Sequence, residues 1–228
     1  SGAGIMPSVK LNRNVDREIP EEKAARRVLA DRRETLEKTL ANVVNAKCGD
    51  SEVVHQLRVA SRRATAAVDS FGVCLPHRQA YKLSSRVKSI RSAAGSIRDW
   101  DVFLQDLADR RERVAEAEAP GLDMLIGDCV ARRIMAQWRF QRVCRKSLKP
   151  FRQRSLKLVA AVSRARGGGR TLGDIGLAQL TVLTDHFFES VSSPLTEVAD
   201  YHALRLALKP LRYAVEIFSG CFGPALRE

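Results

Sequence analysis

Hydrophobic residues recur every three or four positions along most of the chain, which is the spacing of one buried helix face. Leu29, Leu36, Leu40 and Val43 show this spacing in the first such segment. No long stretch alternates hydrophobic and polar residues as a half-buried strand would. The pattern predicts an all-α protein with helices over residues 20–48, 51–75, 77–97, 100–117, 122–148, 151–165, 174–192 and 194–220.

Prolines, glycines and capping residues set the expected ends of these helices. Pro20 precedes two glutamates, an arrangement typical of a first helical turn. Asp99 is suited to cap a helix that begins at the next residue, and Pro150 is expected to separate two helices. The glycine-rich segment 166–170 is the clearest linker. We expect an arm and two helical bundles, over residues 1–19, 20–118 and 119–228.

One helical phrase occurs twice. The segment VHQLRVASRR, residues 54–63, returns as YHALRLALKP, residues 201–210, and the correspondence continues to Phe71 and Phe218. Residues three and seven positions apart share one side of a helix. Each copy therefore carries a cationic stripe, one of His55, Arg58 and Arg62, the other of His202, Arg205 and Lys209. Two matching stripes predict a pseudo-symmetric pair of helical units that face a shared polyanion.

The two copies differ in the length of chain on their C-terminal side. Two more predicted helices come after the first copy, whereas only residues 221–228 come after the helix of the second. If the bundles are true repeats, the second lacks its closing pair of helices. We therefore expect either a truncated second bundle, favoured here, or another element that covers the apolar face of Leu204, Leu208, Leu211, Val215 and Phe218.

Composition narrows the class of partner. The 228 residues carry a formal charge of +13, which favours an anionic partner. No apolar run is long enough to span a bilayer. The five scattered cysteines show neither zinc-ligand spacing nor a disulfide framework. We expect a cytoplasmic protein with free thiols that binds no membrane, metal or cofactor.

The densest charge lies in residues 129–173, which contain no acidic side chain. Solvated helices usually intersperse both signs, so a tract of one sign is expected to bind an anion. Upstream, Lys88, Arg91 and Arg98 lie in helical register with Gly95. This glycine lets a backbone or ligand approach closely, or else allows two helices to pack tightly.

Three other interpretations carry less support. A nucleic-acid partner is less favoured because aromatic residues are few and no familiar base-reading motif is present. Asp99 and Asp101 would offer a metal pair, but a cap and a first-turn acid explain both. His55 and His202 are either anion contacts or interior histidines, and their repeated position favours the anion site. The sequence also contains neither a P-loop nor a nucleophile elbow, two motifs that would have indicated an enzyme.

Taken together, the motifs resemble the conserved histidine α-helical domain (CHAD) family. The resemblance covers about residues 20–220 and rests on HxLRVAxRR at 55–63, on GxxRDxD at 95–101, and on HxLRxxxKxLRYxxExF at 202–218. It implies two helical bundles related by a pseudo-twofold axis, a basic pore or cleft between them, and binding of inorganic polyphosphate. Pro210 stands where the family commonly has a base, so one cation is lost and a kink is expected.

The resulting hypothesis is a non-catalytic module that binds inorganic polyphosphate, in the cytoplasm or at polyphosphate granules. The alternatives are an RNA- or DNA-associating protein and a metal-dependent phosphatase or polyphosphate-processing enzyme. If the chain is a polyphosphate-binding module, the histidines donate hydrogen bonds to the anion, and the lysines and arginines contact its phosphoryl oxygens. The expected contacts are His55, Arg58, Arg62, Arg63, Lys88, Arg91, Arg98, Arg132, Arg133, Arg139, Arg142, Lys146, His202, Arg205, Lys209 and Arg212.

Overall fold

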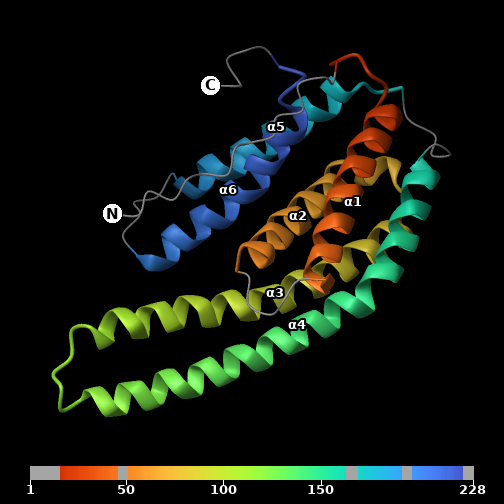
Figure 1. Ribbon diagram of the computed structural model, residues 1–228. Coiled ribbons are helices and arrows are strands. Elements are labelled where there is room, and N and C mark those ends of the chain that lie inside the picture. Colours follow the sequence, from red (N-terminus) through yellow and green to blue (C-terminus); the bar gives the residue numbers. More distant parts are fainter. Residues whose placement is uncertain (1–15, 46–50, 163–168, 192–196, 223–228) are drawn as a thin grey trace. The chain divides into compact units, whose positions relative to one another are not determined.

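The computed structural model describes residues 16–45, 51–162, 169–191 and 197–222 (Figure 1). These residues form six α-helices and one 3₁₀ turn: α1 (Glu21–Asn45), α2 (Ser51–Ser70), η1 (Gly72–Cys74), α3 (His77–Arg111), α4 (Ala119–Val162), α5 (Leu172–Val191) and α6 (Val198–Phe218). The described part of the chain contains no strand, only an isolated bridge between Pro20 and Thr171. The predicted all-α class is confirmed.

Two helices are longer than the sequence predicted. α3 runs through Asp99, which lies in its interior and therefore does not cap a new helix. The reason is that the side of the helix on which Ile90, Ala94 and Ile97 are buried continues through the half-buried Trp100 and Leu104 to the buried Leu107. The predicted break between residues 97 and 100 was wrong, because a capping residue type cannot end a helix whose buried face continues.

α4 likewise joins two predicted helices. It runs through Pro150, and Pro120 lies in its first turn, where the missing N–H has no helical partner to lose. Ser147 and Phe151, on either side of Pro150, are buried. Packing of this face holds the helix across the proline, since tertiary burial outweighs local propensity. α6 also continues past its own proline, Pro210.

The chain forms two compact units that interleave in sequence. Unit 1 comprises the described residues of 1–30, 66–77 and 158–228, and unit 2 comprises those of 31–65 and 78–157. The expected bundle boundary after residue 118 falls inside unit 2, between α3 and α4. The division into bundles 20–118 and 119–228 stays a prediction. The expected end of the first helix at residue 48 and most of the 166–170 linker lie outside the described residues.

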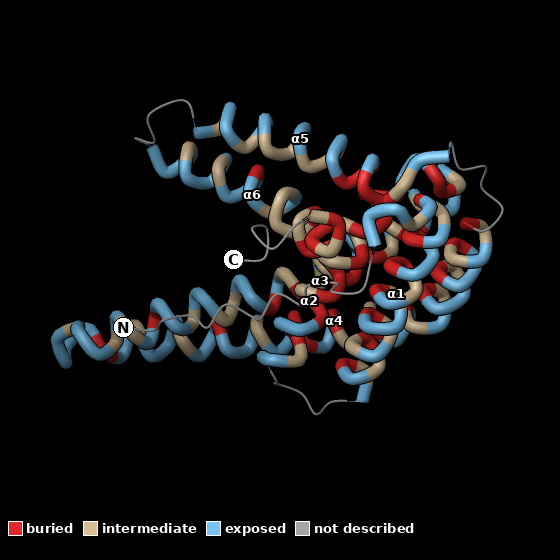
Figure 2. Tube along the Cα trace, turned by 90° about the horizontal axis from the view of Figure 1, so that it is seen from above, coloured by how far each residue is buried: buried red, intermediate tan, exposed pale blue. Residues whose placement is uncertain are grey.

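Unit 2 contains most of α1, α2, α3 and α4. Its fully buried side chains include Leu36, Leu40, Leu57, Ile90 and Phe140. α3 and α4 lie side by side as a long hairpin that projects beyond α1 and α2 (Figures 1 and 2). The colours of Figure 2 show that the outer end of this hairpin is mostly exposed.

Unit 1 contains α5 and α6, which pack against each other. The rings of Phe71 and Phe218 and the side chains of Leu158 and Leu172 form its fully buried centre. Residues 16–19, part of the expected arm, are held here by backbone hydrogen bonds: Leu172 donates to Ile19, and Gly173 donates to Arg17. Residues 1–15 lie outside the described part.

The apolar face of α6 is covered most fully at its C-terminal end, so the expectation of a poorly covered face was wrong for Phe218. Phe218 is fully buried, with one ring atom 3.0 Å from the place that a side chain at Gly176 would occupy. Leu208, one of the residues expected to be poorly covered, is 46% exposed, while Leu204 and Leu211 are half-buried.

No helix of the described residues is both long enough and apolar enough to cross a membrane.

Candidate anion-binding site

The pairing of α2 with α3 in unit 2 brings predicted site residues together around Gly95. Arg58 projects from α2 toward α3, where a side chain at Gly95 would come within 3.3 Å of its Nη1 atom. Gly95 thus leaves room on α3 for the Arg58 guanidinium. Of the two interpretations of this glycine, close packing between helices is the one seen. The group that packs beside Gly95 is the guanidinium of Arg58, which is itself part of the predicted site.

The electrostatics of Arg58 show how crowded this region is. Burial lowers the pKa of its guanidinium, and the charges of Arg62, Arg98 and Arg91 lower it further. Asp99 is the acidic neighbour that opposes them. Arginine stays charged at physiological pH even so. We call Arg58, Arg62, Arg91 and Arg98 the α2–α3 cation cluster; it concentrates more positive charge than its acidic neighbour offsets.

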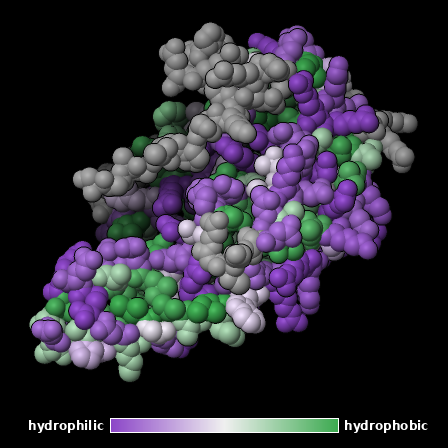
Figure 3. All heavy atoms as spheres, in the orientation of Figure 1, coloured by the Kyte–Doolittle hydropathy of each residue, from purple (hydrophilic) through white to green (hydrophobic). Residues whose placement is uncertain are grey.

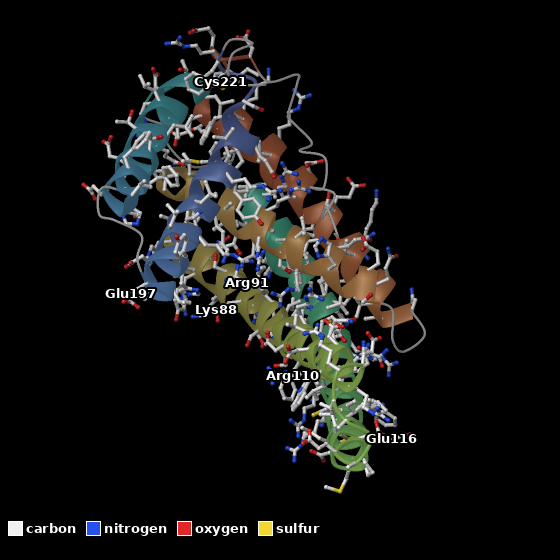
Figure 4. All side chains as sticks on the ribbon, turned by 90° about the vertical axis from the view of Figure 1, so that its left-hand side faces the viewer. Lys88, Arg91, Arg110, Glu116, Glu197 and Cys221 are labelled. Atoms are coloured by element: carbon white, nitrogen blue, oxygen red, sulfur yellow. The ribbon has the colours of Figure 1, made fainter. Side chains whose placement is uncertain are left out.

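The remaining α2 and α3 residues of the predicted site flank this cluster. Arg91 donates from Nη1 to Oγ1 of Thr65 at 3.4 Å, which links the two helices. His55 and Lys88 are exposed, and Arg63 is half-buried. Lys88 and Arg91 lie one turn apart along α3 (Figure 4). The predicted α2 and α3 residues therefore line one helix pair.

Two of the five predicted α4 residues are held by aspartates. Arg133 Nε donates to Asp101 Oδ1 at 3.0 Å, and both side chains are mostly buried. Arg132 Nε donates to Asp128 Oδ2 at 2.7 Å on the surface of α4. Asp101 therefore links α3 to α4 through an ion pair, and it does not lie in the first turn of a helix. Because they already have carboxylate partners, Arg132 and Arg133 are the weaker members of the predicted set.

The acid-free tract receives part of its missing charge from α1. In unit 2, Arg152 lies 3.2 Å from the carboxylate of Glu37. In unit 1, Arg170 makes a two-pronged contact with Glu21 through Nε and Nη2, at 3.1 and 3.0 Å. The expectation that a bound anion must neutralise the tract was wrong for these residues, since their partners are distant in sequence and close in the fold.

The other three predicted α4 residues remain open. Arg139, Arg142 and Lys146 are exposed on the surface of α4. Within the described ranges, none of the three has a carboxylate within 4 Å. They are free to meet a phosphate without first giving up an internal partner.

The second copy of the phrase lies on α6 in unit 1. His202 and Arg205 are exposed, whereas Lys209 and Arg212 are half-buried. Arg212 Nε lies 3.8 Å from Oε1 of the buried Glu216. α5, which packs against α6, has no lysine or arginine in its sequence. Within the described part of unit 1, α5 therefore adds no base to the second stripe.

Corresponding positions of the two copies meet in unit 1. The rings of Phe71 and Phe218 lie 6.2 Å apart at an interplanar angle of 56°. The same register also relates Cys74 to Cys221, and burial raises the pKa of both thiols, that of Cys74 to about 12. Sequence reasoning found the phenylalanines and missed the cysteines, although the same offset relates them.

Sequence reasoning also missed Thr65 and the position of Asp99. Thr65 lies one turn beyond Arg62 on the same side of α2, so the helical spacing of the stripe could have included it. Asp99 acts on Arg58 from inside α3, a placement that becomes visible only when two predicted helices are joined. Across the described ranges, no group of three or more His, Cys, Asp or Glu side chains is placed to hold a metal ion.

A sequence model described as the CHAD domain matches residues 27–228. The chain belongs to the CHAD family. The resemblance inferred from its histidine and arginine motifs is thereby confirmed. No curated protein matches the sequence of this CHAD chain.

Two solved structures share the fold of this CHAD chain. The crystal structure of the CHAD domain from the plant Ricinus communis has a TM-score of 0.68 at 20% identity, over 97% of this chain and 73% of that one. PptA from Streptomyces chartreusis has a TM-score of 0.62 at 16% identity, over 91% of this chain and 78% of that one. At such identities the likeness establishes the helical fold alone.

Proposed function

We propose that this CHAD chain binds inorganic polyphosphate without chemically altering it, and that the α2–α3 cation cluster is the principal contact. The observation that carries the proposal is the environment of Arg58. Its guanidinium is packed against Gly95 among Arg62, Arg91 and Arg98, with Asp99 as the opposing carboxylate. Like charges held this close repel each other, and a phosphate bound among them would relieve that repulsion.

The shape of the charged surface favours a linear polyanion over a small one. From Lys88 to Arg98, the bases of α3 extend over about 15 Å at the rise of an α-helix. A chain of phosphates can contact all of them at once, whereas a single sulfate reaches only one part. Arg139, Arg142 and Lys146 on α4, which also belong to unit 2, offer further contacts to a chain long enough to reach them.

Titration calorimetry with long-chain polyphosphate and with sulfate tests the proposal at near-physiological salt. We expect polyphosphate to bind far more tightly and to lose affinity steeply as salt rises. The double variant Arg58→Glu/Arg98→Glu should weaken binding by about a hundredfold, since hydrogen bonds to charged groups contribute about 1.5–3 kcal/mol each. Equal binding of polyphosphate and sulfate by the natural protein would overturn the proposal.

A matched charge reversal separates the cluster from net charge. Lys23 and Arg26 are exposed on α1 and, in the described part of the chain, make no ion pair. Lys23→Glu/Arg26→Glu removes as much positive charge as the cluster variant and should weaken binding by about threefold or less. Similar losses in the two variants would show that only net charge matters.

The same samples distinguish the other functions. If RNA of equal charge displaces polyphosphate readily, the chain is a nucleic-acid-associating protein. If orthophosphate is released with added magnesium, and the release is lost in His55→Ala, the chain is a polyphosphate-processing enzyme. We expect neither result.

A further inference from the structure

The outer half of the α3–α4 hairpin has an apolar surface that no described residue of unit 2 covers. Its large side chains are exposed, Met124 by 78% and Trp138 by 67%, and Met135, Leu125 and Phe103 accompany them. Figure 3 shows hydrophobic residues gathered over this hairpin. We call these five residues the hairpin face. Soluble proteins rarely leave so many large apolar side chains together in water without a partner.

A hollow into which a partner side chain could fit lies beside the hairpin face. It has a volume of about 420 Å³ and lies between α3 and α4, with Trp100, Met135 and Phe140 in its walls. Trp100 and Phe103 stand edge to face with ring centroids 6.2 Å apart. Arg132 and Arg139 line the hollow as well, so its walls are partly basic, and their aromatic and methionine part suits an apolar side chain of a partner.

The charges around the hairpin face are divided along its length. Residues 106–128, at the outer end, hold seven acidic side chains and only three arginines. Residues 129–149, toward the inner end, hold seven bases and no acid. Arg110 and Glu116 lie near the outer end, and Lys88 and Arg91 lie toward the other end of α3 (Figure 4). The hairpin is thus acidic at its tip and basic at its root.

The charged side chains that form no ion pair in the described part of the chain follow the same division between acidic tip and basic root. At the tip, Arg110 and Arg111 are already bound to Asp106 and Asp123. Glu116 and Glu118 are exposed and form no ion pair within the described ranges. The tip therefore offers carboxylates, while Arg142 and Lys146 near the root offer bases.

We infer that the hairpin face binds a second copy of this chain, with the two hairpins antiparallel. In that arrangement the acidic tip of each hairpin lies over the basic root of the other, so both ends are complementary at once. A parallel pairing would instead place like charges together. A twofold contact of this kind closes on itself and forms a dimer.

The exposed apolar residues suggest the register. Met124, Ala131 and Trp138 are spaced seven residues apart on one side of α4. With the twofold axis at Ala131, Met124 of one copy faces Trp138 of the other, and the small Ala131 permits close approach of the helices. Glu116 and Glu118 then lie near Arg142 and Lys146 of the second copy.

Sedimentation equilibrium without any polyanion tests the inference over about a hundredfold range of concentration. We expect the natural protein to dimerise and Trp138→Asp to weaken dimerisation by at least about tenfold, as for a central apolar contact. Tyr81→Asp is the matched control, because Tyr81 is also on α3–α4, 70% exposed, and outside the hairpin face. A natural protein that stays monomeric, or a control that weakens the dimer as much, would overturn the inference.

Charge reversal tests the antiparallel arrangement separately. Glu116→Lys/Glu118→Lys should weaken the dimer by about fivefold or more, since each interface contains the altered tip twice. Adding Arg142→Glu/Lys146→Glu to the same chain should restore the dimer, because the tip and root charges are then exchanged. If the four substitutions together dimerise no better than the first two, the antiparallel pairing is wrong. Far-ultraviolet circular dichroism of each variant checks that the helices are kept.

Discussion

The two copies of the repeated phrase are alike at one end and different at the other. At their C-terminal ends, Ala67 and Ala214 are both buried, and Phe71 and Phe218 are both fully buried against each other. Corresponding apolar positions have thus kept the same packing role. This end of the repeat serves to hold unit 1 together.

The N-terminal ends of the two copies differ in their neighbours. Arg58 is half-buried on α2 and packs beside Gly95 of a helix that supplies two further arginines. Arg205, at the corresponding position of α6, is exposed beside a helix without a base. The same histidine and arginine spacing therefore gives a cation cluster in one unit and a single stripe in the other. What differs is the helix that packs against the phrase, and that helix decides how concentrated the charge becomes.

The largest effect should come from breaking the end that the copies share. Replacing Phe71 or Phe218 with alanine should destabilise the protein by about 3–5 kcal/mol, because each leaves a cavity among fully buried side chains. The two changes together should cost less than their sum, since the aromatic pair contributes its own about 0.5–1.5 kcal/mol only once. Urea denaturation of the natural protein, both single variants and the double variant measures each value.

An exposed phenylalanine provides the control for this experiment. Phe188 on α5 is 61% exposed, so Phe188→Ala should change the free energy of unfolding by about 0.5 kcal/mol or less. A comparable loss from Phe188→Ala would contradict the assignment of the Phe71–Phe218 pair as the shared centre of unit 1. Strict additivity of the two buried changes would show that the rings do not interact.

The helical spacing of apolar residues predicted the fold class and the buried face of α1, and Pro20 with the two glutamates after it predicted where α1 begins. The prediction was wrong where the type of a single residue suggested that a helix ends. Asp99 has the side chain of a cap and Pro150 that of a breaker, yet both lie inside helices whose buried faces continue through them. Local propensity amounts to about 1–3 kcal/mol at such a residue, and a continuous buried face outweighs it.

The site was predicted as a set of residues, and its internal organisation was not. Spacing alone placed Arg58 and Arg62 on one side of a helix. It gave no way to know that Arg133 would meet Asp101, or that Arg170 would meet Glu21 far away in sequence. Which bases are free and which are neutralised depends on packing between helices, and a single sequence does not specify those contacts.

A smaller effect should come from altering the packing of Arg58 and leaving its charge in place. Gly95→Ala adds a methyl group 3.3 Å from Nη1 of Arg58, so the guanidinium must shift by a few tenths of an ångström. We expect polyphosphate affinity to fall by about two- to fivefold, within the range of a weakened charged hydrogen bond. The shift is small because the displaced atom is the end of a flexible side chain. Calorimetry at near-physiological salt measures the change in affinity.

Gly127 supplies the matched control. It also lies inside a helix, α4, and a side chain there would meet nothing within 4 Å. Both alanine substitutions should stabilise their helices by similar amounts, about 1 kcal/mol, because glycine is the poorer helix former. Only Gly95→Ala should alter binding. If Gly127→Ala lowers the affinity equally, helix stability and not the position of Arg58 controls binding.

The finest comparison is between Cys74 and Cys221, which lie at corresponding positions just beyond the two copies. Burial raises the pKa of both thiols; Glu21 raises that of Cys74 further, to about 12, whereas Arg17 acts to lower that of Cys221. The thiolate is the reactive form, so at pH 8 both should be alkylated slowly by iodoacetamide, and Cys221 should react a few times faster. Mass spectrometry of the labelled peptides measures both rates, and in urea the two rates should become similar. Equal rates in the folded protein would mean that the neighbouring charges do not distinguish these equivalent positions, and that the copies are alike in charge as well as in packing at this end.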